Sequence, residues 1–318
     1  DPAVLLRAMQ YAGELGMFFA SHCEVPELAG PRALNEGAMS YRLGIKGSPA
    51  CAEEIIIDRD IRLAHAAGAH IHIQHVSTRL GMETIRWWKS RGDVRVTAEV
   101  APHHLLFTDE DIRDYDTHYK MNPPLRTRAD TEGLLAGLLD GTFQVFSSDH
   151  APYRYDESGK LPKGEKTTFK DMANGVPGIE LRMPLLYSEG VHTGRMTLEK
   201  FVALTSTDHA QMYGLAHRKG RIAVGLDADI AIWDPLRQTQ VSTHMLHDRV
   251  GYTPYEGKNL TGWPTTVVNR GRVVIAHNEL QVARGSGEFI ARGKPGPLVN
   301  APASTGSAVE GWPVGVLP

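Results

Sequence analysis

Short apolar runs alternate with stretches of helical spacing from residue 1 to about residue 215. Four runs have the length of buried strands, and they cover residues 16–21, 69–74, 94–100 and 143–147. Helical patterns that separate short strands are typical of βαβ units, in which consecutive strands lie parallel. This part of the sequence therefore predicts an α/β fold with a parallel sheet, either a barrel or a doubly wound sheet.

Four helices are expected between these runs. Three of them cover residues 3–15, 52–67 and 129–140, and the fourth carries Met82, Ile85 and Trp88 on one face. Apolar residues at this spacing predict helices that bury one side against a sheet.

The pattern changes after about residue 217. Residues 221–233 are β-rich and punctuated by turns, and residues 265–275 form two strand-like halves around Arg270-Gly271, which is typical of a hairpin. The last residues are rich in Gly, Pro, Ala and Ser and predict a weakly structured arm. The expected division is a barrel-like portion (1–217), a small β-sandwich portion (218–290) and a C-terminal arm (291–318).

The composition excludes several classes of protein. The chain carries 34 Lys+Arg against 37 Asp+Glu, and this near balance gives no basic footprint for nucleic acid or an anionic membrane. No run approaches about 18 uninterrupted apolar residues, so no transmembrane helix is expected. Two cysteines, Cys23 and Cys51, cannot build a disulfide framework, which favours a reducing, cytoplasmic compartment.

Metal-competent side chains follow three of the expected strands. His22 and His75 come directly after the first and second runs, and Asp149 follows the fourth. The carboxyl ends of parallel strands share one edge, where barrel enzymes build their active sites. Imidazole nitrogens and a carboxylate suit Zn²⁺ or another borderline divalent ion with open positions for water. A single histidine is more often a core group, but three residues at three strand ends make a metal site an equal alternative.

Nearby residues are interpreted as structural. His70 and His72 lie inside a strand on one face, so packing or a hydrogen-bond network is the favoured interpretation. Cys23 is interpreted as a small buried thiol.

Three further histidines are candidates for groups that support the site. His103 and His104 follow the third expected strand, and His150 follows Asp149. We expect them to lie behind the ligands rather than to bind metal.

Three segments resemble the motifs of the cyclic amidohydrolases, which include hydantoinases, dihydropyrimidinases, dihydroorotases and allantoinases: H-C-E at 22–24, H-V-S-T at 75–78 and S-D-H-A-P at 148–152. The resemblance covers nearly all of residues 1–290, and the motifs occur in order at family-like separations. It implies a (β/α)8 barrel with two divalent metal ions, usually zinc, at its mouth, followed by a small β-sandwich domain.

The same resemblance implies a reaction and roles. His22 and His75 would bind one metal ion, and Asp149 would bind the other and act as general base and acid. The reaction would be hydrolysis of a C–N bond in a hydantoin or dihydropyrimidine ring by a metal-bridged hydroxide. The family also implies a small-molecule substrate and a homotetramer or homodimer.

Two loops bear on the substrate. The loop at 120–126, K-M-N-P-P-L-R, resembles the dihydroorotase form, in which Asn122 would help to bind the substrate. The loop at 174–180, N-G-V-P-G-I-E, resembles the hydantoinase form, in which Asn174 would contact the ring amide. Both sequences are also strong turn formers. Tyr153 stands where dihydroorotases tend to have His, so the hydantoinase interpretation is favoured and dihydroorotase is the alternative.

The family needs more ligands than residues 1–21 offer. An H-x-H pair and a usually carboxylated lysine are expected upstream of residue 1, either in a longer polypeptide or in a partner. The chain would then hold the later strands of the barrel. A non-catalytic scaffold of the same fold is the alternative from another class, and the metal-competent residues at all three ligand positions argue against it.

Overall fold

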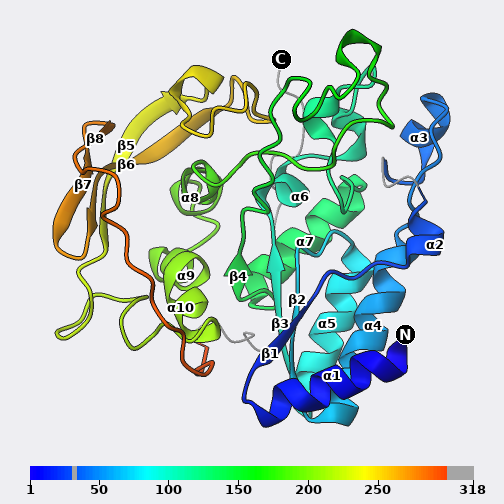
Figure 1. Ribbon diagram of the computed structural model, residues 1–318, viewed down its shortest axis with the longest axis horizontal. Coiled ribbons are helices and arrows are strands. Elements are labelled where there is room, and N and C mark those ends of the chain that lie inside the picture. Colours follow the sequence, from blue (N-terminus) through cyan, green and yellow to red (C-terminus); the bar gives the residue numbers. More distant parts are fainter. Residues whose placement is uncertain (31–33, 299–318) are drawn as a thin grey trace. The chain divides into compact units, whose positions relative to one another are not determined.

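The computed structural model describes residues 1–30 and 34–298 (Figure 1). The described residues form two compact units. The first holds Asp1–Arg182 and Val241–Lys258, and the second holds Met183–Gln240 and residues 259–298. The predicted C-terminal arm lies outside the described residues from residue 299 onward.

The first unit contains a four-stranded parallel sheet in the order β1-β2-β3-β4. The strands are β1 (Phe18–Ser21), β2 (His70–Ile73), β3 (Arg95–Val100) and β4 (Val145–Phe146). Each lies within the run predicted for it, so the α/β class and the parallel sheet are confirmed. Within the described residues, β1 pairs only with β2, and β4 pairs only with β3.

Four helices connect or flank these strands, as predicted: α1 (Pro2–Glu14), α4 (Cys51–Ala67), α5 (Arg79–Arg91) and α7 (Arg128–Asp140). Apolar side chains on each buried face, such as Ile57, Ile85 and Leu134, are fully enclosed. The shorter helices of this unit are α2 (Pro26–Ala29), α3 (Ala38–Arg42), α6 (Pro102–Leu106) and four 3-10 turns (Asp109–Asp111, Thr117–Tyr119, Gly164–Lys166 and Thr243–Met245).

The start of α5 shows how the sequence sets a helix boundary beside the predicted site. Thr78 is the N-cap residue, and its side-chain oxygen accepts a hydrogen bond from the backbone N–H of Gly81. An N-cap Thr satisfies a backbone donor that the helix itself leaves free. The H-V-S-T motif therefore ends a strand and begins a helix within four residues.

The second unit contains an antiparallel sheet in the order β5-β6-β7-β8. The strands are β5 (Ile230–Gln240), β6 (Asn259–Asn269), β7 (Arg272–Ala276) and β8 (Glu279–Leu280). The hairpin predicted around Arg270-Gly271 is confirmed, because Asn269 pairs with Arg272 across it. The strand expected over 221–233 begins only at Ile230, and residues 221–229 form turns, bends and irregular backbone.

The second unit begins earlier in the chain than the predicted boundary at residue 218. Its helical segments are α8 (Arg182–Leu186), which enters this unit at Met183, α9 (Leu198–Val202), α10 (Asp208–Met212) and two π-helical stretches (Tyr187–His192 and Ala203–Thr207). The Tyr187 ring stacks on Trp233 at 5.1 Å, and the backbone N–H of Thr261 donates to Ser188 Oγ at 3.0 Å. Residues 187 and 188 therefore group with the antiparallel sheet.

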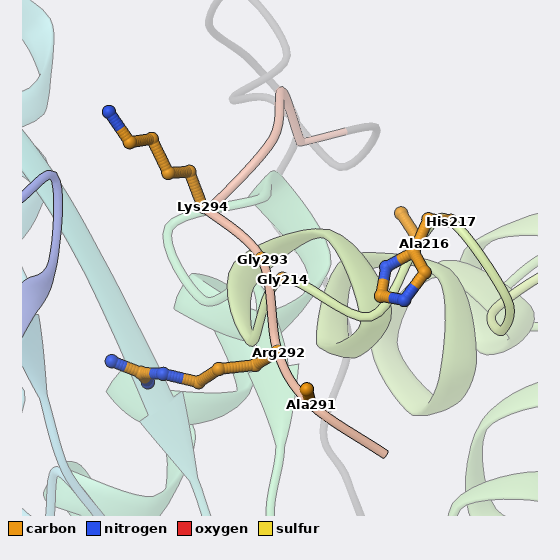
Figure 2. A pocket seen from close by; sticks show the side chains of 7 residues that line it. All are labelled: Gly214, Ala216, His217, Ala291, Arg292, Gly293 and Lys294. Atoms are coloured by element: carbon orange, nitrogen blue, oxygen red, sulfur yellow. The ribbon is translucent and has the colours of Figure 1, made fainter.

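The second unit also has an open pocket of about 490 Å³ (Figure 2). Gly214, Ala216 and His217 line one side and residues 291–294 line the other, and the backbone N–H of Gly293 donates to the carbonyl of Gly214 at 2.7 Å. Residues 291–298 form neither helix nor strand, as predicted for the arm. No residue singled out from the sequence as a site residue lines this pocket.

None of the helices within the described parts of the chain is long and apolar enough to cross a membrane.

Candidate active site

The pairing of β1 with β2 brings His22 and His75 together. Ser21 is opposite Ile73, and both histidines follow their strands at the carboxyl edge of the sheet. His22 Nδ1 lies 2.8 Å from His75 Nε2, and the two rings meet edge to face with centroids 4.7 Å apart. Two of the three predicted ligands are therefore neighbours.

His75 is the buried member of the pair. Burial, and then the charge of His22, lower the pKa of His75 to about 4, so its imidazole is neutral near pH 7. Its Nδ1 is buried and has no hydrogen-bond partner within the described residues. A neutral imidazole is the form of histidine that binds a metal ion, and the nitrogen of His75 that faces His22 is Nε2.

Glu99 supports His75, and the sequence reasoning did not single it out. Glu99 Oε1 accepts a hydrogen bond from the backbone N–H of His75 at 3.3 Å, and Oε2 lies 3.2 Å from His72 Nε2. Burial alone would raise the pKa of Glu99, but the hydrogen bond and charge of His72, together with His75, lower it overall. A carboxylate between Ala98 and Val100, near the end of the strand-like run at 94–100, is the signal that could have identified it.

Asp149, the third predicted ligand, lies beyond β4. Its side chain is 27% exposed, and Oδ2 lies 3.8 Å from Nε2 of the fully buried His103. Burial, and then the negative charge of Glu99, raise the pKa of Asp149 to about 7. A carboxyl group with this pKa can hold or release a proton near neutral pH, as a general acid and base must.

Both His75 and Asp149 have an unusual backbone. Their φ angles are +31° and +44°, in the left-handed region that side chains other than glycine rarely adopt. Such a conformation costs about 1–3 kcal/mol, and it persists only where the surroundings impose it. Six other non-glycine residues of the described chain also have a positive φ, among them Arg270 and Asn278 in turns, so this conformation is shared by the two predicted ligands without being confined to them.

The predicted supporting histidines contact the loops rather than the predicted ligands, with one exception. His104 Nε2 lies 3.1 Å from the carbonyl of Pro123, beside Asn122. His150 Nδ1 accepts hydrogen bonds from the backbone N–H groups of Gly178 and Ile179, at 3.1 and 3.3 Å. His103 is the exception, since it faces Asp149 and neither of its ring nitrogens has a hydrogen-bond partner within the described residues.

The two predicted substrate residues each present an unused amide oxygen. Asn122 Nδ2 lies 3.3 Å from His22 Nε2, which places this side chain beside the histidine pair. The Oδ1 atoms of Asn122 and Asn174 are buried and have no hydrogen-bond partner in the described parts of the chain. Buried amide oxygens are normally satisfied, so these two are exceptions that a bound ligand with N–H donors would explain.

The structural interpretations of His70, His72 and Cys23 are confirmed. His70 Nε2 and His72 Nδ1 both lie 2.9 Å from Thr97 Oγ1. Cys23 is 3% exposed, and burial raises the pKa of its thiol.

The metal-binding capacity of these residues is partial. His22 Nδ1 and His75 Nε2 lie 2.8 Å apart, at hydrogen-bond distance, whereas two nitrogens bound to one tetrahedral zinc, with bonds of about 2.0–2.1 Å, lie ~3.3 Å apart, so the two rings would have to separate slightly to share a metal ion. Within residues 1–30 and 34–298, no group of three His, Cys, Asp or Glu side chains is arranged to hold a metal ion. The histidine pair therefore fits one side of a metal site.

A family model for the amidohydrolase family matches residues 1–274 of the chain. Among curated proteins, a dihydroorotase from Halalkalibacterium halodurans is 39% identical over 278 residues, which cover 87% of this chain and 63% of that protein. A dihydroorotase from Pelotomaculum thermopropionicum is 41% identical over 276 residues, which cover 86% of this chain and 62% of that protein. The chain thus spans less than two thirds of the length of these relatives.

The solved structures of similar fold are named dihydropyrimidinase or hydantoinase, whereas these curated relatives are named dihydroorotase. The dihydropyrimidinase from Brevibacillus agri NCHU1002 superimposes with a TM-score of 0.84 at 30% identity, over 92% of this chain and 64% of that one. The D-hydantoinase from Thermus sp. gives a TM-score of 0.83 at 30% identity, over 93% of this chain and 64% of that one.

Proposed function

The chain belongs to the amidohydrolase family, and we propose that the protein it forms hydrolyses a C–N bond in a cyclic amide ring. The observation that carries this proposal is the meeting of His22 and His75 at the carboxyl edge of the parallel sheet. Relatives named dihydroorotase, dihydropyrimidinase and D-hydantoinase support the same class of substrate.

His22 and His75 would hold one divalent metal ion, and Asp149 would hold a second. The family resemblance favours zinc for both. Metal ions bound there would lower the pKa of a water molecule and polarise the carbonyl group under attack.

The chain's own residues handle the proton and the ring. Asp149 would take a proton of the attacking water at a carboxylate oxygen and return it to the leaving ring nitrogen, and its position beyond β4 beside His103 supports this role. Glu99 holds the backbone of His75, and so orients this imidazole toward His22. Asn122 and Asn174 accept hydrogen bonds from ring N–H groups through their unused Oδ1 atoms.

The architecture of the protein follows from the same family. The parallel sheet would be part of a (β/α)8 barrel, and the antiparallel sheet would be part of a small β-sandwich domain. The structural similarity to dihydropyrimidinase and D-hydantoinase supports both assignments. We also propose a cytoplasmic homo-oligomer, either a tetramer or a dimer, with no nucleic-acid or membrane partner.

Two substrate classes remain distinguishable by charge. The loop at 174–180 and Tyr153 favour a neutral hydantoin or dihydropyrimidine ring. The identity of 39–41% to proteins named dihydroorotase, against 30% to the dihydropyrimidinase and D-hydantoinase structures, favours dihydroorotate, which carries a carboxylate. The loop at 120–126, which resembles the dihydroorotase form, agrees with the identity values, so dihydroorotate is the stronger candidate although the loop at 174–180 and Tyr153 favour a neutral ring.

A side-by-side assay tests both levels of the proposal. The purified whole protein, loaded with zinc, would be offered dihydroorotate, dihydrouracil and a 5-substituted hydantoin, and ring opening would be followed by chromatography. Faster turnover of dihydroorotate supports the dihydroorotase assignment, and faster turnover of a neutral ring supports the hydantoinase one. No ring opening together with less than one bound metal ion per chain would favour the non-catalytic scaffold.

A further inference from the structure

Two lysines are buried in the first unit without an acidic partner. Lys120 and Lys160 have 1% and 0% of their surface exposed, and neither forms an ion pair within the described residues. A buried ammonium group normally pairs with a carboxylate because its desolvation is costly. These two side chains instead donate hydrogen bonds to backbone carbonyls.

Lys120 reaches the segment that precedes Asn174. Its Nζ donates to the carbonyls of Phe169 and Met172, both at 2.6 Å. The same Nζ lies 5.2 Å from the centroid of the Phe169 ring. The side chain of Lys120 therefore fixes the backbone two to five residues before Asn174.

Lys160 reaches the backbone that precedes Asn122. Its Nζ donates to the carbonyl of Lys120 at 3.1 Å and lies 3.4 Å from the carbonyl of Thr117. The carbonyl of Lys120 also accepts a hydrogen bond from the backbone N–H of Gly175 at 3.0 Å. One carbonyl oxygen thus joins Lys160, the Asn122 loop and the Asn174 loop.

Gly175 has little freedom to move away from this junction. Its φ is +141°, and a Cβ atom there would lie 2.5 Å from the Cβ of Ala151. Its carbonyl accepts a hydrogen bond from Tyr252 Oη at 3.1 Å. The centroid of the Tyr252 ring lies 5.6 Å from Lys160 Nζ, so Lys160 lies close both to the Lys120 carbonyl and to the tyrosine that bonds Gly175.

We propose that Lys120 and Lys160 are positioning residues that hold Asn122 and Asn174 at a fixed separation, and thereby set the affinity of the site for a ring amide. The inference rests on the proposed function for the nature of the ligand. The connection between the two loops rests only on the hydrogen bonds described above.

The environment of the lysines is consistent with this role. Burial, and then the charge of Lys120, lower the pKa of Lys160 to about 7, and burial lowers the pKa of Lys120 to about 8. The acidic group that acts on Lys120 is Asp171, which is itself paired with Lys163. A neutral amine keeps two N–H donors, so Lys160 can still bond the Thr117 and Lys120 carbonyls after it loses its proton.

Substitution of Lys160 tests the proposal on the whole protein. Lys160→Met keeps most of the side-chain length and removes the donors, and Lys160→Gln restores one donor group on a shorter chain. Lys166→Met is the matched control, because Lys166 is an exposed lysine of the same loop. The readouts are hydrogen exchange of the Gly175 amide, and KM and kcat for the ring substrate that the assay above identifies.

The expected result is a tenfold or greater rise in the exchange rate of the Gly175 amide in Lys160→Met. KM should rise at least fivefold while kcat stays within threefold, and Lys166→Met should match the parent in both readouts. A purely structural role would instead lower the fraction of folded enzyme, and therefore apparent kcat, without changing KM.

Three results would overturn the proposal. They are parent-like exchange at Gly175, a KM within twofold of the parent in a folded Lys160→Met protein, and loss of folding in both Lys160 variants. If the parent opens no cyclic amide, the proposed function fails, whereas the exchange measurement still decides whether Lys160 joins the two loops.

Discussion

His22 Nδ1 lies 2.8 Å from His75 Nε2, although 53 positions separate the two histidines in the sequence. The parallel register of β1 and β2 brings the two strand ends together, since Ser21 pairs with Ile73 and the backbone N–H of Gln74 donates to the carbonyl of Ser21, and the next residue, His75, turns out of the strand direction with a φ of +31°.

Removing either histidine should lower metal binding. We expect His22→Ala and His75→Ala each to reduce the divalent metal bound by the whole protein by at least half, because each removes one of two facing nitrogens. Metal content after dialysis, measured by mass spectrometry, checks this. His192→Ala, at an exposed position, is the control, and parent-like metal content in both site variants would exclude these histidines as ligands.

Replacing Asp149 should separate chemistry from folding. Asp149→Asn keeps the size of the side chain and removes the proton acceptor, so kcat should fall by about 10²–10⁴-fold. The thermal midpoint of the metal-free protein should not fall, because burial already disfavours the ionised carboxylate. Turnover within tenfold of the parent would remove Asp149 from its proposed role, and Asp156→Asn, at an exposed position, provides the comparison.

Glu53 should be important for stability near His75. Its Oε1 accepts hydrogen bonds from the backbone N–H groups of Ser77 and Thr78 at 2.9 and 3.1 Å, and its Oε2 contacts Ser77 Oγ. Glu53→Ala would leave these buried donors without an acceptor, and should lower the free energy of unfolding by at least about 3 kcal/mol. Urea denaturation measures this change.

The neighbouring residue offers a control for that experiment. Glu54 is half-buried on the same helix, and its side chain forms no hydrogen bond within the described residues. Glu54→Ala should therefore change the free energy of unfolding by less than about 1 kcal/mol. Equal losses in the two variants would show that the Ser77 and Thr78 contacts contribute little.

Stability should rise with pH through the range in which Lys160 loses its proton. Burial, and then the charge of Lys120, lower the pKa of Lys160 from 10.5 to about 7 in the folded state. The unfolded chain therefore binds more protons between these values, and each unit of pH in that window adds up to about 1.4 kcal/mol to the free energy of unfolding. The penalty is fully present below pH 7.

Urea denaturation at pH 7 and pH 9.5 measures that dependence. The parent should gain more stability between the two pH values than Lys160→Met, by more than about 1 kcal/mol, because the variant has no amine to titrate at this position. Equal gains would mean that Lys160 keeps an ordinary pKa in the folded protein.

The sequence predicted the features that depend on local pattern. Residues 16–21 and 69–74 alternate with helical stretches, and this alone led to the parallel sheet and to the neighbouring strand ends at His22 and His75. The hairpin at Arg270-Gly271 was likewise predicted from a short turn motif between two apolar runs.

Features that depend on distant packing were not predicted. Glu99 acts on His75 only because β3 lies beside β2, and Lys160 finds its acceptors 40 and 43 positions away. No periodic pattern and no motif in the sequence indicates either contact. The early start of the second unit has the same origin, since it depends on the stacking of Tyr187 on Trp233.

At His75 and Asp149 the backbone is left-handed, so the residues needed for the proposed activity also lower the stability of the fold. Asparagine and glycine adopt this conformation more easily than histidine or aspartate, so a change to either would relieve part of the strain. Such a change would also remove an imidazole or a carboxylate from the proposed site. Engineering this protein for thermal stability alone would therefore tend to select against the residues on which its proposed chemistry depends.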